Sequence, residues 1–573
     1  MANPTIRFLA LGAALWTSAA LLAGQASGPK FFPDDPLRED ADRALDAKNA
    51  QPTNASDIFD FASNTYLKPG EKRDIPAPNV NSLDEVPDSS WFTNRIGRRD
   101  MDLAEIVKGP DRFDTIDVQD WPITGGKGEG LQPGYRVTSP EGHTWQIEFD
   151  PPTNLEMASG AEVIGTAIYH AIGYNVVDVY IVEFDRARLK ISPKATVRDP
   201  ATGHRRPMNH EDLEAVFART KPLPNGRYRG VASRFADGKP LGSFTYYGTR
   251  PDDPNDVFLH EHRRELRGNR VFAAWINHDD SRGPNSLDML LESDGRSWVK
   301  HYMFDFGSIL GSGTTRAQAP RASNEYIHEW KPGLLTLATF GLYLKPWLLI
   351  DYPDVAPSVG RVESKVFDPV TWKPEYPNPA FQNMRPEDAF WGARIVARFS
   401  NDALRKVVEK AKYSDPAATD YLTQVLVERR DKVVRTWVNG VTPLVDARLT
   451  ADGRFTAGNA AMALGVAEAA GASYRAQWFT LNNDTHGEQP VGAPLDVGSA
   501  SGADAPATVA MTAPPEVLAG SPYIGVRVTG AHAAHPGWGA NPATFFFRKI
   551  ATGWELVGVE RFAPPIASTA KAG

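Results

Sequence analysis

Two short motifs near the middle of the chain hold residue types that suit phosphoryl transfer. The first runs from His278 to Asn285 with the sequence His-Asp-Asp-Ser-Arg-Gly-Pro-Asn, and the second is Asp305-Phe306-Gly307. Phosphoryl transfer needs a carboxylate beside the attacking hydroxyl group, and it needs oxygen ligands for the metal ion that neutralises the phosphates. The two motifs contain both sets of groups, provided that the fold brings them together.

A β-hairpin between the motifs would bring them together. The apolar-rich segments 286–291 and 298–304 flank the stretch 292–297, which contains the dipeptide Asp294-Gly295. An Asp-Gly pair between two such segments is a strong signal for a tight hairpin turn. We therefore predict two antiparallel strands that return the second motif to the end of the first.

The motifs resemble the protein-kinase signature His-Arg-Asp-Leu-Lys-x-x-Asn followed by Asp-Phe-Gly. Asp279, Ser281 and Arg282 stand where that signature has Arg, Leu and Lys. The surroundings are more similar to atypical bacterial members of this superfamily, the HipA-like, CotH-like and phosphoinositide-kinase-like proteins, than to the eukaryotic enzymes. The resemblance implies an ATP-dependent phosphotransferase with Mg²⁺.

The same resemblance assigns roles to residues of both motifs. Asp280 would orient the attacking hydroxyl group, and Arg282, in the position of the signature's Lys, would also be catalytic. Asn285 and Asp305 would hold Mg²⁺. Carboxylate chemistry without nucleotide is a further alternative, namely a hydrolase that uses Asp279, Asp280 and Asp305, but no separate motif supports it.

The segment before the first motif has the element order of a kinase small lobe. Short strands are predicted at 121–124, 135–138 and 144–149, and a helix at 156–171 carries apolar residues on one face. Glycines in the first connection would let backbone amides approach phosphates closely. The cofactor-binding residues implied by this arrangement are Gly126, Lys127, Gly128, Gly130 and the helix residue Glu162.

One position departs from the kinase pattern. The third strand of a kinase small lobe carries a Lys that pairs with the helix Glu and holds phosphates, whereas this chain has Glu148 there. A carboxylate at that position repels phosphates and faces Glu162 with like charge. Either Lys127 replaces the missing cation, with Arg136 as a weaker substitute, or the site no longer binds nucleotide.

We predict an α+β protein with a two-lobed, protein-kinase-like fold. The β-rich small lobe would span 116–252 with an insertion, and the helical large lobe would span 253–440. An irregular extension, 27–115, precedes them as a lead-in rather than part of a core, and a β-rich domain, 441–573, follows. Within that last domain, Gly492–Pro514 is predicted to be a long surface loop because it is rich in Ala, Pro and Gly.

Composition and the N-terminus bear on location and partners. The 573 residues carry a net charge of −8 and no cysteine, so nucleic-acid binding is unsupported and disulfides are excluded. Arg7 and the apolar run 8–22 predict a signal peptide, residues 1–26, and the run is shorter than the roughly 20 residues of a membrane-spanning helix. We expect no transmembrane segment after cleavage and a periplasmic or secreted protein.

Two main functions follow from these observations. The first is an exported kinase-like phosphotransferase that binds nucleotide and transfers phosphate to an unknown acceptor. The alternative is a catalytically inactive kinase-like protein, a pseudokinase, that uses the same cleft to bind a partner in the cell envelope.

Overall fold

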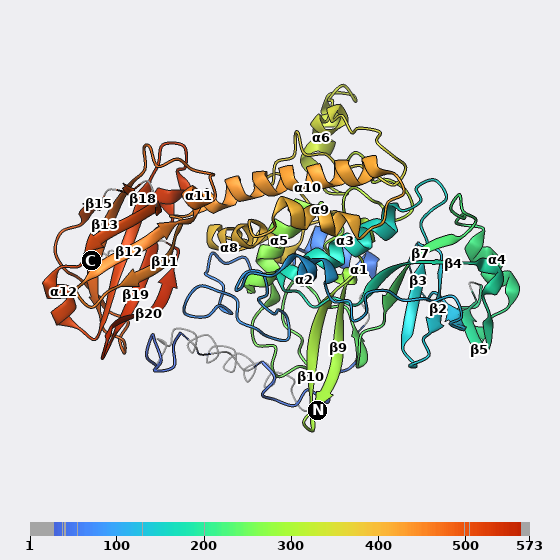
Figure 1. Ribbon diagram of the computed structural model, residues 1–573, viewed down its shortest axis with the longest axis horizontal. Coiled ribbons are helices and arrows are strands. Elements are labelled where there is room, and N and C mark those ends of the chain that lie inside the picture. The colour runs from blue at the N-terminus through green and yellow to red at the C-terminus, as the bar shows by residue number, and fades with distance from the viewer. Residues whose placement is uncertain are drawn as a thin grey trace, which may run out of the picture.

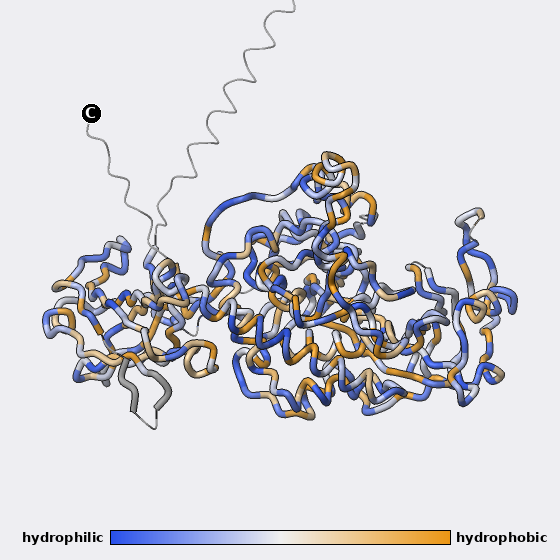
Figure 2. The backbone as a smooth tube through the Cα atoms, turned by 90° about the horizontal axis from the view of Figure 1, so that it is seen from above, coloured by the Kyte–Doolittle hydropathy of each residue, from blue (hydrophilic) through white to orange (hydrophobic). Residues whose placement is uncertain are grey.

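The chain forms a mixed α+β structure with sheets at both ends and helices between them (Figure 1). The computed structural model describes residues 28–36, 38, 42–53, 56–128, 130–199, 201–497, 499–502 and 505–562. The predicted signal peptide, 1–26, lies outside the described residues. Seen from above, the two sheet-containing ends and the helical middle again lie one after another along the long axis (Figure 2).

A seven-stranded sheet occupies one end of the molecule, with the strand order β4-β7-β3-β2-β1-β5-β6. All neighbouring strands are antiparallel except β1 and β5, which are parallel. The strands are β1 (Ile123–Gly126), β2 (Gly134–Thr138), β3 (Thr144–Glu148), β4 (Val179–Phe184), β5 (Ile191–Arg198), β6 (Arg205–Pro207) and β7 (Tyr228–Arg234). The predicted glycine-rich connection joins β1 to β2, as expected.

The two faces of this sheet differ in character. Along β3, Trp145 and Ile147 are buried, while Gln146 and Glu148 are partly exposed on the other face. The buried side chains pack with Phe217 of α4 (His210–Phe217), whose N-terminus is capped by Asn209 in a capping box. The polar face of β3 is therefore left for the candidate site.

Helices form the middle of the molecule (Figure 1). They are α2 (Leu103–Lys108), α3 (Met157–Ile172), α5 (Arg264–Ile276), α7 (Pro379–Gln382), α8 (Pro386–Val396), α9 (Asn401–Glu409) and α10 (Pro416–Trp437). One of them, α3, packs against β4 and β7 of the seven-stranded sheet. The helical part of the chain was expected from residue 253, but its first α-helix, α5, begins only at Arg264. His260 is held by Asp256 and by the carbonyl group of Thr245, at 2.6 Å each, which fixes a separate turn before the helix.

The predicted hairpin between the two motifs is confirmed. It consists of β9 (Ser286–Ser293) and β10 (Arg296–Met303), paired from Ser286 with Met303 to Ser293 with Arg296. Asp294 and Gly295 both have positive φ, 53° and 73°, as a two-residue type I′ turn requires. A third strand, β8 (Lys239–Gly242), pairs with β9 instead of joining the seven-stranded sheet.

The C-terminal part contains two sheets that pack face to face. A four-stranded sheet has the order β11-β12-β17-β16, and a second sheet has β14-β13-β18-β19-β20 with β15 beside β13. Phe455 of the first sheet contacts Trp478, Phe545 and Phe547 of the second. The strands and short helices are β11 (Leu444–Leu449), β12 (Arg454–Asn459), α11 (Ala460–Ala463), β13 (Ser473–Leu481), β14 (Glu488–Pro490), β15 (Leu495–Val497), β16 (Ser499–Gly502), β17 (Ala505–Thr512), α12 (Pro515–Gly520), β18 (Tyr523–Ala531), α13 (Gly537–Ala540), β19 (Ala543–Ile550) and β20 (Gly553–Glu560).

The prediction that Gly492–Pro514 is a long surface loop is wrong. This stretch forms β15, β16 and β17, and β17 pairs with the central strand β12 over five residue pairs. Small residues such as Ala and Thr occupy a strand without difficulty where the neighbouring strand supplies the hydrogen bonds, so local composition was misleading here.

The N-terminal extension is also not the loose lead-in that was expected. Phe31 packs with Phe479 and Phe546 of the C-terminal sheets, and the amide of Thr53 donates to Leu241 of β8. Further along, α1 (Asp57–Ala62) lies against the first motif, and Trp91 and Phe92 are buried in the main core. The extension thus runs across the C-terminal sheets, the hairpin and the helices.

Truncating a buried side chain of the extension should destabilise the whole fold. Trp91 is 3% exposed and stacks on His301 with ring centroids 3.5 Å apart. We expect Trp91→Ala to lower the free energy of unfolding by about 3–5 kcal/mol, because it leaves a large cavity. Urea unfolding followed by fluorescence checks this, with Trp330→Ala as control, since Trp330 is 68% exposed. Equal stability of the two variants would contradict the placement of the extension in the core.

Candidate functional site

The first motif forms a loop that leaves the C-terminal end of α5. Asn277 ends the helix in the left-handed region, with φ 60°, and His278 follows as a fully enclosed side chain. Burial and the nearby Arg282 charge lower the pKa of His278 to about 3, so its ring is neutral. The His278 ring lies 5.5 Å from that of Phe306 in the second motif. The two motifs are therefore in contact.

Internal bonds fix the shape of this loop. The Nδ2 group of Asn285 donates to the carbonyl oxygen of Asp280 at 2.9 Å, and the Ser281 hydroxyl donates to the His278 carbonyl at 2.8 Å. Arg282 forms an ion pair with the Asp280 carboxylate and approaches Glu375 at 3.3 Å. Because Asn285 uses its nitrogen inside the loop, its side-chain oxygen is the atom that it can offer to a metal ion.

Unlike Asp280, Asp279 is held on both its side chain and its backbone by hydrogen bonds from other parts of the protein. Gln318 donates to its carboxylate, and its carbonyl oxygen accepts from the amide of Glu375 at 2.7 Å. Burial raises the pKa of Asp279 well above its ordinary value, with the negative charges of Asp280 and Glu375 acting in the same direction. This carboxyl group is thus held by the protein, which speaks against the hydrolase alternative in which it acts on a substrate.

The second motif turns sharply beneath α3. Asp305 has φ 64°, and the short turn Phe306–Ser308 follows it. Phe306 is buried against Gly165 of α3, where a Cβ atom would come within 2.5 Å of the Phe306 side chain. A glycine at this point of the helix lets the second motif pack closely enough to reach the carboxylate of Glu162.

Glu162 faces the second motif from α3. Its carboxylate accepts hydrogen bonds from the backbone amides of Gly307 and Phe306, which favour the ionised form. Burial nonetheless raises its pKa well above the ordinary value, and the charges of Asp305 and Glu148 add to this rise. The structure therefore brings Glu162, Glu148 and Asp305 close together.

Lys127 supplies a positive charge to this cluster. Its ammonium group forms an ion pair with the Glu148 carboxylate on β3, and both side chains are about four-fifths buried. The Lys127 charge also opposes the rise in the pKa of Asp305. A Lys from the glycine-rich connection has thus reached the place where the kinase pattern has a strand Lys.

The three glycines of this connection lie in different surroundings. A Cβ atom at Gly126 would come within 2.8 Å of Val197 on β5, so this glycine is needed for strand packing. Gly130 has φ 90° and a Cβ atom there would lie 2.9 Å from the Lys127 nitrogen. Gly128 has no atom within 4 Å of that position. Of the three, only Gly128 has open space beside its Cα atom, whereas the space beside Gly130 is taken by the Lys127 side chain.

The carboxylates of the site repel one another. Burial raises the pKa of Asp305 to about 6, and Glu148 adds to the rise, while Lys127 and Arg282 oppose it. Burial likewise raises the pKa of Asp280 to about 7, with Arg282 opposing and Glu375 and Asp305 adding. A divalent cation beside Asp305 would relieve this repulsion, so the donor set fits Mg²⁺.

Few protein ligands are on offer for such a cation. Among the described residues, no group of three or more His, Asp or Glu side chains is placed to hold a metal ion. Mg²⁺ at phosphoryl-transfer sites usually takes only one or two protein carboxylates, with water and phosphate oxygens completing its shell. Asp305 and the oxygen of Asn285 are compatible with that kind of site.

Sequence reasoning missed three acidic residues beside the first motif. Glu375 lies some seventy residues after the second motif and pairs with Arg282, and Asp57 of α1 contributes to the field at Asp305. Asp60, also of α1, accepts from the Tyr376 hydroxyl at 2.6 Å and lies against Gly283. The capping serine Ser56 marks a helix start in the sequence, but nothing in the pattern says where that helix docks.

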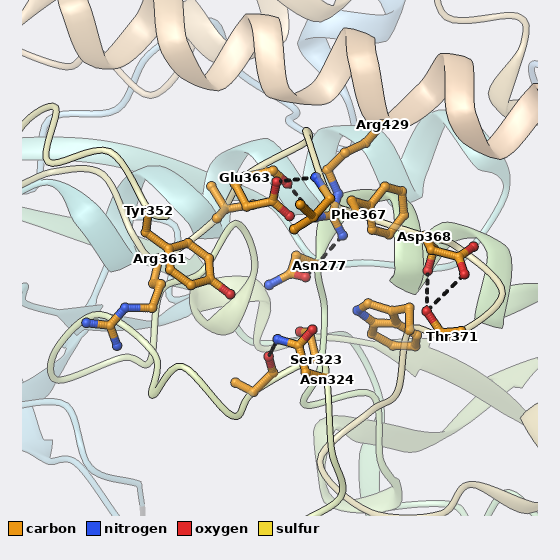
Figure 3. A pocket seen from close by; sticks show the side chains of 14 residues that line it. Asn277, Ser323, Asn324, Tyr352, Arg361, Glu363, Phe367, Asp368, Thr371 and Arg429 are labelled. Atoms are coloured by element: carbon orange, nitrogen blue, oxygen red, sulfur yellow. Dashed lines mark hydrogen bonds between the residues drawn. The ribbon is translucent and has the colours of Figure 1, made fainter. Parts of the chain in front are cut away.

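A separate pocket lies behind the first motif and is formed by other residues (Figure 3). Arg429 of α10 reaches into this region and donates to the carbonyl groups of Ala274, Trp275 and Glu363 at 2.6–2.9 Å, and to the Asn277 side chain at 3.1 Å. Arg429 thus satisfies the free carbonyl groups at the end of α5. Arg429 thereby fixes the start of the loop 278–285, and the pocket contains none of the predicted site residues.

Comparison with known proteins leaves the chain without an assigned family. No protein-family model matches it, and no curated protein matches it. A solved structure of the Golgi casein kinase matches with a TM-score of 0.27 and 9% sequence identity, over 60% of this chain and 84% of that chain. A likeness of this size is too low to establish a fold.

The repulsion within the site should make stability depend on pH. Because the folded pKa of Asp305 is raised to about 6, the folded state binds more protons than the unfolded state below that pH. Stability therefore falls as pH rises from about 4 to 6 and stays low above it. We expect Asp305→Asn to raise Tm at pH 8 by about 2 °C or more, with a smaller gain at pH 5.

A thermal-unfolding series from pH 5 to 8, without divalent cations, measures this difference. Asp484→Asn is the matched control, since Asp484 is exposed in the C-terminal part. A lower Tm for Asp305→Asn at pH 8 would mean that Asp305 stabilises the fold, contrary to the electrostatics of the site.

Proposed function

We propose that this protein is an atypical kinase-like phosphotransferase that uses ATP and Mg²⁺ and acts after export, in a periplasm or outside the cell. The observation that carries the proposal is the meeting of Lys127, Glu162 and Asp305 with the loop of Asp280 and Asn285. These residues come from four separate segments. A packing requirement alone gives no reason to gather ionisable groups of like charge at one buried point.

The residues divide into three tasks. Asn285 and Asp305 would hold Mg²⁺, which supplies charge neutralisation for the phosphates when bound. Lys127, with the backbone amides near Gly128 and Gly130, would bind phosphate oxygens. Its ion pair with Glu148 keeps the Lys127 ammonium group at the site, in place of the missing strand Lys.

Asp280 is suited to orient a hydroxyl group and accept its proton. Its pKa of about 7 lies near the working range of a general base at neutral pH. Arg282 holds the Asp280 carboxylate through an ion pair and is itself held by Glu375, so the loop keeps one geometry. Arg282 would also provide positive charge close to the transferred group.

The pseudokinase alternative is favoured by one specific observation. Glu148 occupies the strand position and neutralises Lys127, which leaves less net positive charge for a triphosphate than a kinase normally offers. If this pair does not open, the same cleft would serve as a binding surface for an envelope partner. Nucleotide binding separates the two functions.

Removal of Lys127 should weaken nucleotide binding. We expect Lys127→Ala to raise the Kd for ATP with Mg²⁺ or Mn²⁺ by about tenfold or more, since a charge-assisted hydrogen bond is lost. Isothermal titration of residues 27–573 measures this, with Lys194→Ala as the control on an exposed part of β5. In Asp305→Asn the metal dependence of binding should disappear. No nucleotide binding by the unaltered protein with either metal would support the pseudokinase instead.

Removal of the base should leave binding intact and stop turnover. We expect Asp280→Asn to bind ATP with the affinity of the unaltered protein and to lose a factor of about 10² or more in phosphate transfer. The release of labelled phosphate to water, or its transfer to the protein itself, gives a readout that needs no known acceptor. Unchanged turnover in Asp280→Asn would rule out its role as base.

A further inference from the structure

An exposed apolar projection stands on the helical part of the molecule, well separated from the sheets. It consists of α6 (Trp330–Ala338) and the chain that continues to Leu349 (Figure 1). No residue of α6 is buried. We propose that this projection inserts into the interfacial region of a lipid bilayer.

The apolar surface of the projection is large and continuous in sequence. Phe340 is 96% exposed, Leu342 84% and Leu337 74%. The other large apolar side chains of the projection that water reaches are Trp330, Leu334, Leu335, Leu344, Leu348 and Leu349. Exposed apolar surface gathered in this way marks a binding surface, because a protein that stays in water rarely keeps it.

The distribution of charged residues along the projection favours contact with a bilayer over exposure to water. Residues 332–344 contain no charged side chain, and Lys331 and Lys345 stand at the two ends of this stretch. Trp330 and Trp347 lie just outside the lysines. Tryptophan and lysine are the side chains that accumulate where the hydrocarbon of a membrane meets its headgroups. The apolar stretch between them would then lie in the upper hydrocarbon region.

Both threonine hydroxyl groups of the projection are bonded within it, which suits a hydrocarbon environment. The Thr336 hydroxyl donates to the Pro332 carbonyl at 2.9 Å, and the Thr339 hydroxyl donates to the Leu335 carbonyl at 2.8 Å. The Thr339 hydroxyl also accepts from the amide of Tyr343 at 2.9 Å. These bonds remove the cost of taking both threonines out of water.

Backbone bonds complete this internal pairing where the helix ends. The amide of Gly341 donates to the Thr336 carbonyl at 2.8 Å, and the amide of Leu342 donates to the Thr339 carbonyl at 3.0 Å. Pro332 has no amide hydrogen, so the first turn of α6 has one fewer free donor.

The shape of the projection also favours a bilayer over a protein partner. The apolar side chains continue from α6 through the turn at Phe340 to Leu344, so they form a convex tip rather than a groove. Among the described residues, no helix is long and apolar enough to cross a membrane. Shallow insertion from one side is therefore the geometry that the projection offers.

The base of the projection is fixed to the body by ion pairs. Lys345 pairs with Glu325 at 2.6 Å, and the Trp347 ring nitrogen donates to the same carboxylate at 2.8 Å. Lys373 pairs with Glu329 at 2.7 Å. The tip would thus enter the bilayer while its base, held by charges, stays at the surface.

Vesicle binding tests this inference without nucleotide, so its failure is separate from any failure of the phosphotransferase proposal. The protein used is residues 27–573, which contains every described residue and lacks the apolar run 8–22. It is sedimented with phosphatidylcholine vesicles, alone or with phosphatidylglycerol. We expect binding to both, because the projection is apolar and carries little net charge.

A variant at the tip should lose this binding. Leu334→Ser, Leu337→Ser, Phe340→Ser and Leu342→Ser together should lower the partition coefficient by at least tenfold, since each removed side chain contributes to burial in lipid. The matched control replaces four exposed apolar residues elsewhere with Ser: Val257, Leu464, Leu495 and Ile550. The control should bind like the unaltered protein, and thermal unfolding should show that both variants are folded.

Three outcomes would overturn the inference. The first is no sedimentation with either vesicle. The second is binding only to anionic vesicles that the tip variant retains, which would indicate adsorption elsewhere. The third is a dimer in sedimentation velocity that the tip variant converts to monomer, with no vesicle binding, which would make the projection an interface between copies of the chain.

Discussion

The arrangement of the molecule depends on buried guanidinium groups that hold α5. Arg264 binds Asp388 of α8 at 3.0 Å and reaches the N-terminal extension at the carbonyl group of Asp84, at 2.7 Å. Arg267 approaches the same Asp388 at 3.4 Å and donates to the carbonyl oxygen of Ile75 at 2.9 Å. Losing one partner of such a buried pair commonly costs about 3–5 kcal/mol, because a charge stays in the interior unpaired. Since α5 leads directly into the loop 278–285, these bonds also fix where Asp280 can lie.

Arg429 completes this restraint from the opposite side. It binds the last carbonyl groups of α5 and the side chain of Asn277, where the helix ends. The loop that follows is therefore fixed at its start by Arg429 and at its end by the β9–β10 hairpin. The proposed phosphoryl transfer would need this kind of support, because reacting groups must be held closely to the productive geometry. The carboxylates of the site work against this restraint, because the negative charges of Glu148, Glu162 and Asp305 repel one another.

The two motifs and the hairpin could be predicted because their signals are local. The Asp-Gly turn specifies the register of β9 and β10, and the register then brings Asp305 back to Asn285. The meeting of Lys127 with Glu148 could be anticipated from the missing strand Lys. The rest is set by contacts between distant segments. The docking of α1 on Gly283 depends on Asp60 and Tyr376, which are more than three hundred residues apart.

The wrong predictions for the C-terminal strands and the N-terminal extension also arise because contacts between distant segments decide these parts of the fold. The strands β16 and β17 contain few large apolar residues; β17 pairs with the edge of β12, and β16 then pairs with β17. The early residues of the extension look irregular because their hydrogen bonds go to other segments, as when the Asn79 amide donates to the buried Glu265 at 2.5 Å. The helix α6 is mostly apolar, yet it has no buried residue. An apolar pattern shows which side chains avoid water and leaves open whether protein or another apolar medium covers them.

Glu375 connects the loop 278–285 with the base of the apolar projection. Its amide donates to the Asp279 carbonyl at 2.7 Å, and its carboxylate approaches Arg282 in the catalytic loop. Its own carbonyl oxygen accepts from the amide of Ile327, at 2.8 Å, at the base of the projection. A single residue thus links the loop to the base through its backbone. If the tip lies in a bilayer, these bonds keep the loop 278–285 at a fixed place relative to the membrane surface. The segment between the second motif and α7 then has a physical reason for its length, because it must reach the bilayer and return to hold Arg282.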